Sequence, residues 1–498
     1  MFVLCSALLL VTHAPSAPAD LIQNVKNKLF LDAPGRPWKE TVLSGKGRYN
    51  GVDDRYTLRF RPDGMFVSTL EGGLNELEGF DGSDYWQQNH SGTSRTLAFE
   101  DVDELMGSEL LQTNRWLEPG AGVSLVAAGN TIHISNRSGF KEDIEIDPVT
   151  YLPKSATFPL SAGPVKVTLS DWRAAGSRLL PFHVEIIAKS GNVDSYTIDK
   201  VTQATDSDPA SYKAPAQTTG MATFDASKAS TITVKHAETG HLLVHPMVNG
   251  KDIGWFILDS GAETMCVDTK IANDNKLGAL GVLPMTGIGG TVQGHYRPVK
   301  EFSLGPVTLK NALFVELDLQ EISAFLKIPI AGIVGNEFFD HAIVSVDTKL
   351  PSVSVFDPAT YKLSTGKWAK MQFESGNPLV EASTEGDRRG WYRIDTGDSG
   401  TITYYGPYVE REKLLDGRET TDGQLGGVGG LIPMKSGKAK WFELGGHRFE
   451  DVPAAYALGK EGGFADRYIA GNIGQALLTP FTVVFDYAQS RVAFISKE

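Results

Sequence analysis

Short runs in which apolar and polar side chains alternate dominate residues 20–212. Residues 56–60 and 165–169 are two of them, and Gly, Asp and Pro separate one run from the next. Alternation with a period of two indicates a strand with one buried face, and many such strands joined by turn residues are typical of an antiparallel sheet or an open barrel. Residues 20–31 and 101–111 instead place apolar side chains at helical spacing, so we expect two short amphipathic helices in this α+β domain.

Two apolar runs further along the chain end in the same way. Residues 255–262 read Trp-Phe-Ile-Leu-Asp-Ser-Gly-Ala, and residues 391–398 read Trp-Tyr-Arg-Ile-Asp-Thr-Gly-Asp. A carboxylate that directly follows a buried strand is costly unless it has partners, and its double occurrence suggests that Asp259 and Asp395 meet. Two carboxylates in one site hold one proton between them and can act as acid and base together. The structural alternative is that both are ordinary turn caps.

The likeness of the two segments extends beyond these motifs. Each is followed by a glycine-rich turn, a strand pair, a second apolar motif with Gly and a closing strand. In chain order these elements are residues 287–290, 302–309, 331–336 and 343–347, and then residues 426–430, 442–449, 470–475 and 483–486. The two Asp-Ser/Thr-Gly motifs are 136 positions apart, and Gly335 and Gly474 are 139 positions apart. An internal duplication explains this match, so we expect two lobes, residues 236–360 and 361–498.

The ordered set of elements resembles the retropepsin and pepsin class of aspartic proteases over roughly residues 240–498. The resemblance implies a mainly β fold, a bilobal pair of acid-protease-like β-barrels with Asp259 and Asp395 as catalytic residues on a pseudo-twofold axis. One carboxylate would take a proton from a bridging water while the other donates to the oxygen of the scissile carbonyl. The last motif of the second half is looser, because Asn472 and Ile473 replace the apolar pair. The implied activity is that of an endopeptidase without metal or cofactor.

The resemblance also assigns supporting roles. It implies that Ser260 and Thr396 hydrogen-bond across the axis, and that Gly261 and Gly397 bring backbone N–H groups close to the carboxylates. The glycine-rich hairpins match the mobile flap that covers the substrate in this family and binds an extended peptide by strand addition. The flap glycines are Gly287, Gly289, Gly290, Gly427 and Gly429. Which hairpin folds over the cleft stays open.

The second half departs from the family at Asp398. A small or hydroxyl residue follows Asp-Ser/Thr-Gly in the family, and Ala262 provides it in the first half. A third carboxylate raises the cost of ionising Asp395 unless Asp398 turns outward or meets a cation, and Ser399 is then the residue available for the hydroxyl role. This departure keeps a second hypothesis open, namely a catalytically inactive protein that binds a peptide, a lipid or a lipoprotein.

The domain formed by residues 20–212 resembles the lipoprotein-carrier-like half-barrels of the bacterial cell envelope. The resemblance rests on the rhythm of strands and turns in residues 79–88, 146–154, 170–173 and 180–182. It implies a curved antiparallel sheet whose apolar concave face holds a lipid, lipoprotein or peptide, although a structural or docking domain explains the pattern equally well. A third hypothesis is a regulatory protease whose first domain senses an envelope lipid. Residues 213–235 are expected to be a linker.

Composition and charge narrow the set of partners. The chain has 498 residues and a net charge of −13 at pH 7, without a block of Lys and Arg, which argues against nucleic acid and anionic membranes as main partners. Residues 1–19 carry no Asp, Glu, Lys or Arg, begin with an apolar run and end in Ala-Pro-Ala. They fit a signal peptide cut before Asp20, which predicts a periplasmic or secreted protein. We expect a monomer that acts on a peptide or protein substrate.

Other site chemistries fit the residues less well. Cys266 is the single cysteine beyond the expected leader, so the mature chain can form neither an intramolecular disulfide nor a cysteine metal cluster. His236, His241 and His245 are close in sequence, but they follow an expected linker and strand rather than one helical face. No acidic ligand is patterned with them, and we therefore expect no metal site.

Overall fold

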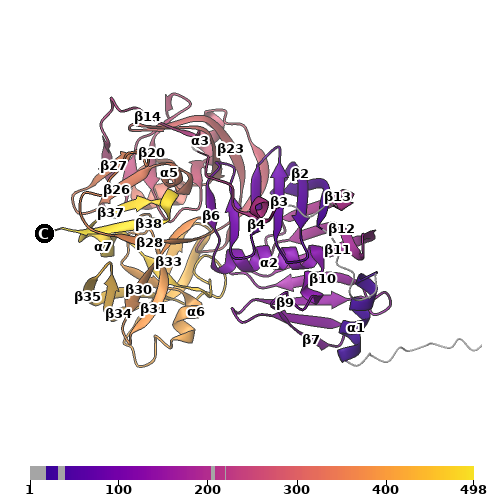
Figure 1. The fold of residues 1–498 in the computed structure, drawn as a ribbon. Coiled ribbons are helices and arrows are strands. Elements are labelled where there is room, and N and C mark those ends of the chain that lie inside the picture. The colour runs from indigo at the N-terminus through magenta and orange to yellow at the C-terminus, as the bar shows by residue number, and fades with distance from the viewer. Residues whose placement is uncertain (1–17, 32–39, 204–207, 219, 498) are drawn as a thin grey trace, which may run out of the picture.

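The chain is mainly β, with one large sheet on one side and two β lobes on the other (Figure 1). The computed structural model describes residues 18–31, 40–203, 208–218 and 220–497. Residues 1–17, the greater part of the expected signal peptide, lie outside this range. In the part of the chain that is described, no helix is long and apolar enough to cross a membrane.

The N-terminal sheet is a 13-stranded antiparallel meander in the order β6-β5-β4-β3-β2-β1-β13-β12-β11-β10-β9-β8-β7. Its strands are β1 (Thr41–Tyr49), β2 (Val52–Phe60), β3 (Phe66–Glu71), β4 (Glu76–Phe80), β5 (Tyr85–Gln88), β6 (Ser94–Thr96), β7 (Ser124–Ala128), β8 (Thr131–Ser135), β9 (Lys141–Ile146), β10 (Pro153–Phe158), β11 (Val165–Ala175), β12 (Arg178–Ile187) and β13 (Val193–Gln203). Asn50 and Gly51 join β1 to β2 with positive φ at both positions, which is the backbone that a two-residue hairpin turn requires.

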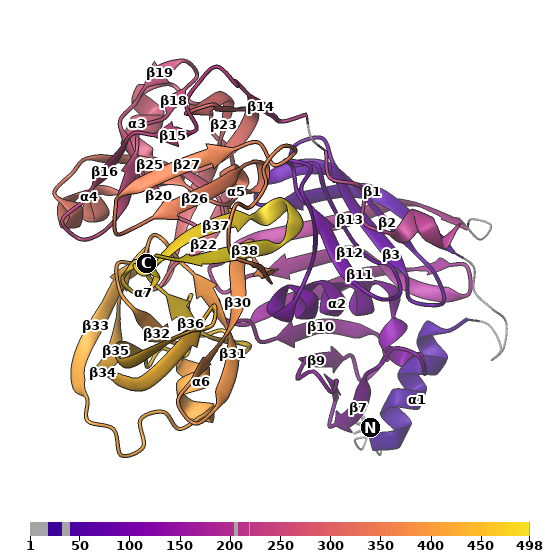
Figure 2. The ribbon, with the colours of Figure 1, turned by 60° about the vertical axis from the view of Figure 1, so that its left-hand side comes forward.

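Two helices pack on the apolar face of this sheet. They are α1 (Pro18–Leu29) and α2 (Phe99–Thr113), close to the two helices that the apolar spacing predicts. Leu21 and Val25 of α1 share one buried cluster with Leu110 of α2 and with Tyr56 of the sheet. Figure 2 shows α2 lying across the curved strands. The sheet thus wraps around its own helices, as expected for a half-barrel of the α+β type.

The first lobe is an 11-stranded sheet with the main order β16-β17-β20-β25-β21-β24-β23-β18-β19, to which β14 and β22 attach through β24 and β23. Its strands are β14 (Ala222–Phe224), β16 (Val234–His236), β17 (Leu242–Val244), β18 (Met247–Val248), β19 (Lys251–Asp252), β20 (Trp255–Leu258), β21 (Met265–Asp268), β22 (Leu280–Thr286), β23 (Thr291–Leu304), β24 (Val307–Leu317) and β25 (Ile330–Val334). Its helices are α3 (Thr269–Asp274), α4 (Gln320–Leu326) and α5 (Asn336–His341).

The second lobe repeats this topology in an eight-stranded sheet ordered β29-β30-β31-β36-β32-β35-β34-β33. Its strands are β29 (Gln372–Glu374), β30 (Asn377–Thr384), β31 (Arg388–Ile394), β32 (Ile402–Tyr404), β33 (Thr421–Gly427), β34 (Gly430–Leu444), β35 (His447–Ala457) and β36 (Ile469–Ile473), with helices α6 (Gly406–Arg411) and α7 (Gln475–Leu478). Both β20–β25 and β31–β36 are parallel pairs, whereas β21–β25 and β32–β36 are antiparallel.

A six-stranded sheet, ordered β15-β27-β26-β37-β38-β28, ties the two lobes together. Its strands are β15 (Thr231–Ile232), β26 (Ile343–Asp347), β27 (Ser352–Phe356), β28 (Trp368–Lys370), β37 (Phe481–Asp486) and β38 (Arg491–Ser496). The antiparallel pair of β26 and β37 joins one closing strand from each lobe. Figure 2 shows these strands between the lobes, so neither lobe can rotate freely against the other.

The expected linker, residues 213–235, contains the short strands β14 and β15 and the first residues of β16. β14 pairs with β24 of the first lobe and β15 pairs with β27 of the six-stranded sheet, so this segment extends both sheets. Just before it, the η2 turn (Pro209–Tyr212) is held to the N-terminal sheet, because the Trp86 indole N–H donates to the Tyr212 carbonyl at 2.8 Å. The Ala, Ser, Thr and Asp content of the segment suits a loop, but edge pairing overrides that local preference.

Arg95 of β6 anchors the N-terminal domain on the lobes. Its guanidinium donates to the Asn336 side chain at 2.9 Å and forms an ion pair with the fully buried Asp340. The same group lies 3.9 Å from the centre of the Phe373 ring, a cation–π contact. One side chain therefore touches both lobes, and its charge is compensated only while the N-terminal domain is docked.

We expect Arg95→Met to lower the free energy of unfolding by roughly 3–5 kcal/mol, because methionine keeps the apolar stem but leaves a buried carboxylate without its cation. Arg55→Met is the matched control, since it removes an exposed ion pair to Glu71 and should have a much smaller effect. Urea unfolding followed by circular dichroism measures both. Equal losses in the two variants would contradict a buried anchor at Arg95.

Candidate active site

Two parallel strand pairs bring Asp259 and Asp395 to equivalent positions. Asp259 directly follows β20, and its backbone N–H donates to the Val334 carbonyl of β25 at 3.0 Å. Asp395 directly follows β31, and its N–H donates to the Ile473 carbonyl of β36 at 2.9 Å. Each carboxylate therefore begins its loop at the end of a buried parallel strand, as the two apolar runs predict.

Reciprocal hydrogen bonds lock the two loops against each other. The Ser260 backbone N–H donates to Thr396 Oγ1 at 2.9 Å, and the Thr396 N–H donates to Ser260 Oγ at 3.1 Å. Each hydroxyl then donates to a carbonyl of the opposite strand, from Ser260 to Ile394 at 2.8 Å and from Thr396 to Leu258 at 2.9 Å. Both side chains are fully buried. This set of bonds has the pseudo-twofold symmetry that the duplicated motifs imply.

Gly261 and Gly397 let the two carboxylates approach each other. The Gly261 N–H donates to Asp259 Oδ1 at 2.8 Å, and the Gly397 N–H donates to Asp395 Oδ1 at 2.9 Å. A Cβ atom at Gly261 would overlap the Asp395 carboxylate, and a Cβ at Gly397 would overlap that of Asp259. Only glycine therefore fits at either position. The overlap also shows that the two carboxylates face each other across the lobe junction.

Side chains from distant segments support the two loops. The Tyr487 hydroxyl donates to the Ser260 carbonyl at 3.0 Å, and the Gln475 amide donates to the Thr396 carbonyl. His241 Nε2 lies 2.9 Å from the Gly397 carbonyl, which can only accept, so this nitrogen carries the proton. Thr239 Oγ1 lies 2.8 Å from the other ring nitrogen. None of these supports has a local sequence signal, since their partners lie far away along the chain.

The surroundings of Asp259 favour its protonated form. Burial and then the negative charge of Asp395 raise the pKa of Asp259 well above its usual range, and the hydrogen bond from Gly261 opposes this only in part. The titration belongs to the pair, because each charge alters the ionisation of the other. The protonated form of Asp259 is consequently favoured in the folded protein.

Asp398 shares an amide with Asp395. Asn472 Nδ2 donates at 2.9 Å to Asp395 Oδ2 and at 2.9 Å to Asp398 Oδ2, while the Gly400 N–H donates to Asp398 Oδ1 at 2.7 Å. Burial and then the Asp395 charge raise the pKa of Asp398 to about 6. The third carboxylate therefore meets an amide rather than a cation. The replacement of an apolar residue by Asn472, seen in the sequence, is what supplies this amide.

Both glycine-rich hairpins meet at their tips. The Gly289 N–H of the β22–β23 hairpin donates to the Val428 carbonyl of the β33–β34 hairpin at 3.1 Å. Side chains at Gly287 or Gly289 would overlap the opposite hairpin, and a Cβ at Gly427 would reach Ile288. Gly290 and Gly429 complete the same contact. The sequence left open which hairpin is the cover, and the structure joins the two.

The N-terminal domain contacts the base of the first hairpin. The Val282 N–H of β22 donates to the Asn50 carbonyl at 2.7 Å, and the Asn50 amide donates to the Tyr296 hydroxyl of β23 at 3.0 Å. At the tip, the Gly463 N–H donates to the Gly287 carbonyl at 3.1 Å. The neighbouring Gly462 N–H donates to Ser161 of the N-terminal domain at 2.9 Å. The first hairpin is thus held at its base and at its tip.

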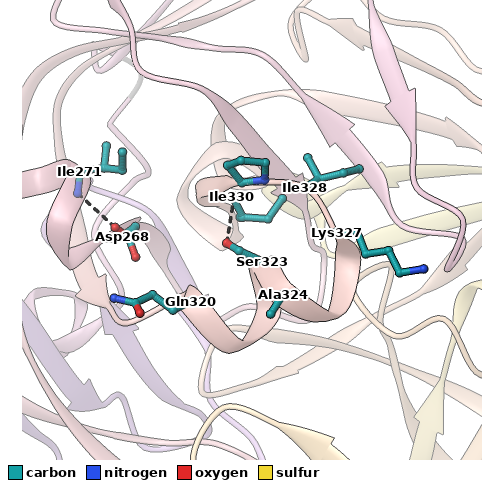
Figure 3. Close-up of a pocket in the computed structure, with 9 residues that line it drawn as sticks. Asp268, Ile271, Gln320, Ser323, Ala324, Lys327, Ile328 and Ile330 are labelled. Carbon is teal, nitrogen blue, oxygen red and sulfur yellow. Dashed lines mark hydrogen bonds between the residues drawn. The ribbon is translucent and has the colours of Figure 1, made fainter.

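A surface hollow of about 430 Å³ lies between α3 and α4 of the first lobe (Figure 3). Two of its polar side chains are occupied by backbone contacts: Asp268 accepts from the Ile271 N–H at 3.1 Å, and Ser323 accepts from the Ile330 N–H at 3.0 Å. Asp268 thereby caps α3, and Ser323 ties α4 to β25. The hollow is a structural feature of the lobe.

The neighbouring histidines His241 and His245 have different partners. His241 contacts the loop at Gly397, whereas His245 lies 3.1 Å from Asp252 in a different part of the lobe. Across the described ranges, no group of three His, Cys, Asp or Glu side chains is placed to hold a metal ion. Cys266 is buried, and burial raises the pKa of its thiol.

Residues 244–338 match a family model described as aspartyl protease. The matched range runs from the end of β17 into α5 and includes Asp259 and the first glycine-rich hairpin. It supports an aspartyl protease domain in the first lobe, while the second lobe lies outside it. No curated protein matches the chain.

We expect Thr396→Val to lower the free energy of unfolding by about 2–4 kcal/mol, because it leaves the buried Ser260 N–H and Leu258 carbonyl without their partner. Thr396→Ser keeps the hydroxyl and should cost only about 1 kcal/mol for the lost methyl group. Chemical unfolding of both variants provides the comparison. If valine and serine cost the same, the cross-axis bonds contribute no net stability.

Asp398 should make stability depend on pH. Its folded pKa of about 6 lies above the value of about 3.9 for an unfolded chain, so folding favours the protonated form. The contribution of Asp398 to the free energy of unfolding is complete below about pH 4 and is lost as the pH rises through about 6. Thermal unfolding should therefore show the wild type losing stability relative to Asp398→Asn between these values. Asp387→Asn, in the exposed β30–β31 turn, is the control, and parallel profiles for all three proteins would refute the assignment.

Proposed function

We propose that the protein is an aspartic endopeptidase that hydrolyses peptide bonds with a water activated between Asp259 and Asp395. The observation that carries the proposal is the reciprocal hydrogen bonding of Ser260 and Thr396, which holds two carboxylates at one point between the lobes. If the two aspartates were independent turn caps, the loops would need no hydrogen bonds to each other. Neither carboxylate would need to lie close to the glycine of the opposite loop. The aspartyl protease match of the first lobe supports the same conclusion.

In the proposed reaction Asp395 is the base and Asp259 is the acid. Asp395 takes a proton from the water as the water oxygen attacks the scissile carbonyl carbon, and Asp259 gives its proton to the carbonyl oxygen. The resulting tetrahedral diol collapses when Asp395 returns its proton to the leaving nitrogen, the C–N bond breaks and Asp259 recovers a proton from the diol. Products and enzyme then balance, without a covalent intermediate or cofactor.

The joined hairpins are the proposed cover of the substrate. An extended peptide between them and the carboxylates would pair with hairpin backbone in the manner of an added strand. Because the tips at Gly289 and Val428 are bonded to each other, both hairpins would have to move for a long peptide to enter. Closure over the peptide would then exclude bulk water from the reacting groups.

A docking role for the N-terminal domain has support in the Arg95 anchor and in the contact of Asn50 with the first hairpin. A lipid or lipoprotein ligand on its concave face is the alternative, although α1 and α2 already cover apolar surface there. For localisation we propose the periplasm or secretion, on the basis of the apolar, uncharged residues 1–19. Asp398 sustains the second candidate function, an inactive peptide-binding protein.

Asp259→Asn and Asp395→Asn should each reduce peptide cleavage by roughly 10²–10⁴-fold, since each removes one half of the acid–base pair. Purified residues 20–498 are incubated with a mixed peptide library from acid to neutral pH, with and without pepstatin, and products are identified by mass spectrometry. Asp387→Asn, on an exposed turn of the same hairpin as Asp395, is the matched control.

Loss of cleavage in both variants with retention in the control would establish the paired carboxylates as the catalytic centre. Cleavage that survives both changes would contradict the proposal and point to a different site. Absence of cleavage by the wild type at every pH would favour the binding protein. Asp398→Ala, which recreates Ala262 of the first half, is then the variant to test for restored activity.

A further inference from the structure

The strands that end at the two carboxylates present different side chains to the junction of the lobes. Alternate residues of a strand lie on one face, so Ile257 shares the face of Asp259, and Arg393 shares the face of Asp395. The register makes them equivalent, because Ile257 pairs with Leu243 and Arg393 pairs with Leu379 on corresponding neighbours. The pseudo-twofold relation thus makes Ile257 of the first lobe equivalent to Arg393 of the second lobe.

The flank beside Asp259 is apolar. On the parallel neighbour, Ile257 is paired with Ile333, and both belong to a buried cluster that includes Cys266 and Ile330. Met285 of the first hairpin and Val428 of the second pack against this cluster. A peptide side chain that packs against this cluster would contact hydrocarbon, which favours an apolar residue.

The flank beside Asp395 is polar and cationic. The parallel neighbour of Arg393 is Asn472, at the position that Ile333 occupies in the first lobe. Arg393 Nε is buried without a hydrogen-bond partner. Among the described residues, no ion pair within 4.0 Å joins a carboxylate to the Arg393 guanidinium. Burial lowers the pKa of Arg393, but neighbouring groups raise it above its usual range, so the guanidinium stays charged while its Nε keeps an unused donor.

The groups that compensate the Arg393 charge act on it electrostatically. They are Tyr405, Glu263, Asp395 and Glu374. Burial raises the pKa of Glu263, and burial together with Asp466 raises that of Glu374 well above its usual range, so Glu374 is held as a neutral acid. Glu263 is turned instead to Asn377, whose amide donates to it at 3.2 Å.

We propose that Arg393 is a specificity-determining residue that binds an acidic side chain of the substrate next to the scissile bond. A planar guanidinium matches a carboxylate with two parallel hydrogen bonds, and a substrate carboxylate would supply the partner that Arg393 lacks. The Ile257 flank takes an apolar residue on the other side of the bond. This inference rests on the proposed peptidase function and names its substrate class, peptides with an acidic and an apolar residue around the cleaved bond.

The test compares quenched fluorescent peptides that differ at one position beside a leucine, namely Glu, Gln or Leu, in both orders along the peptide. At pH 6, where a substrate glutamate is ionised, the wild type should show kcat/KM at least tenfold higher for Glu than for Gln in one of the two orders. Arg393→Ile, which recreates the first-lobe residue, should reduce the Glu/Gln ratio to about one, and Arg393→Lys should keep part of it. Arg389→Ile, an exposed change on the same strand, should keep the wild-type ratio.

Two cleavage outcomes would overturn the proposal while leaving the peptidase intact. One is a wild-type Glu/Gln ratio near one with cleavage that still depends on both aspartates. The other is an Arg393→Ile variant that loses the same factor on all three peptides, which would make Arg393 a positioning residue for the carboxylate pair. Circular dichroism of each variant verifies that it is folded.

A binding measurement keeps the inference separate from catalysis. Isothermal titration of the Asp259→Asn variant with the same peptides should give tighter binding of Glu than of Gln, by at least tenfold. Adding Arg393→Ile to this variant should remove the difference. If Asp259→Asn binds the three peptides equally or binds none of them, the acidic subsite is refuted, whether or not the wild type cleaves peptides.

Discussion

The reciprocal hydrogen bonds of Ser260 and Thr396 are the constraint on which the rest of the site depends. Two carboxylates that face each other repel when both are ionised, so something other than their own interaction must hold them together. Four bonds between buried groups do this, each side chain serving the opposite strand. Because every partner is buried, breaking one bond exposes no group to water, and the cost of separation is the full loss of the bond. The Ser260 and Thr396 hydrogen bonds therefore set the spacing of the two carboxylates. The six-stranded sheet only prevents the lobes from rotating about this contact.

The symmetry of the backbone is not matched by the side chains around it. Strand order, parallel pairing and the Asp loops repeat from one lobe to the other. At equivalent positions, however, the second lobe has Asn472 in place of Ile333 and Arg393 in place of Ile257. The polar side chains of this pair of positions, Arg393 and Asn472, thus both lie in the second lobe. The asymmetry extends to the carboxyl groups, because Asn472 donates a hydrogen bond to Asp395 whereas the equivalent residue Ile333 has no polar side chain. Burial and then the Asp395 charge raise the pKa of Asp259, so the two equivalent loops place their carboxyl groups in different surroundings.

The positions of the carboxylates follow from features that are local in sequence, and the supports around them do not. An apolar run ending in Asp-Ser/Thr-Gly can be recognised from sequence, because the strand, the turn and the charged residue are adjacent. Its repetition indicates that Asp259 and Asp395 lie in one site. The β-rich bilobal fold follows from the same periodicity. By contrast, the amide of Asn472 and the hydroxyl of Tyr487 reach the loops from 77 and 227 positions away, and no local pattern encodes such a distance. The short strands β14 and β15 could not be predicted from the sequence for a related reason. Whether a segment pairs at the edge of a sheet depends on the strand beside it rather than on the composition of the segment.

In the proposed peptidase, access to the site depends on the contacts that the hairpins make with each other and with the N-terminal domain. Separating the tips breaks the bond between Gly289 and Val428, and lifting the first hairpin also strains its contacts with Asn50 at the base and Gly463 at the tip. These are few backbone bonds near the surface, the kind of contact that opens at low free-energy cost compared with global unfolding. The Arg95 anchor is of the opposite kind, since it buries a charge pair. Opening is therefore expected to occur at the hairpins while the N-terminal domain stays docked, so the bond between Asn50 and Val282 fixes where the first hairpin bends.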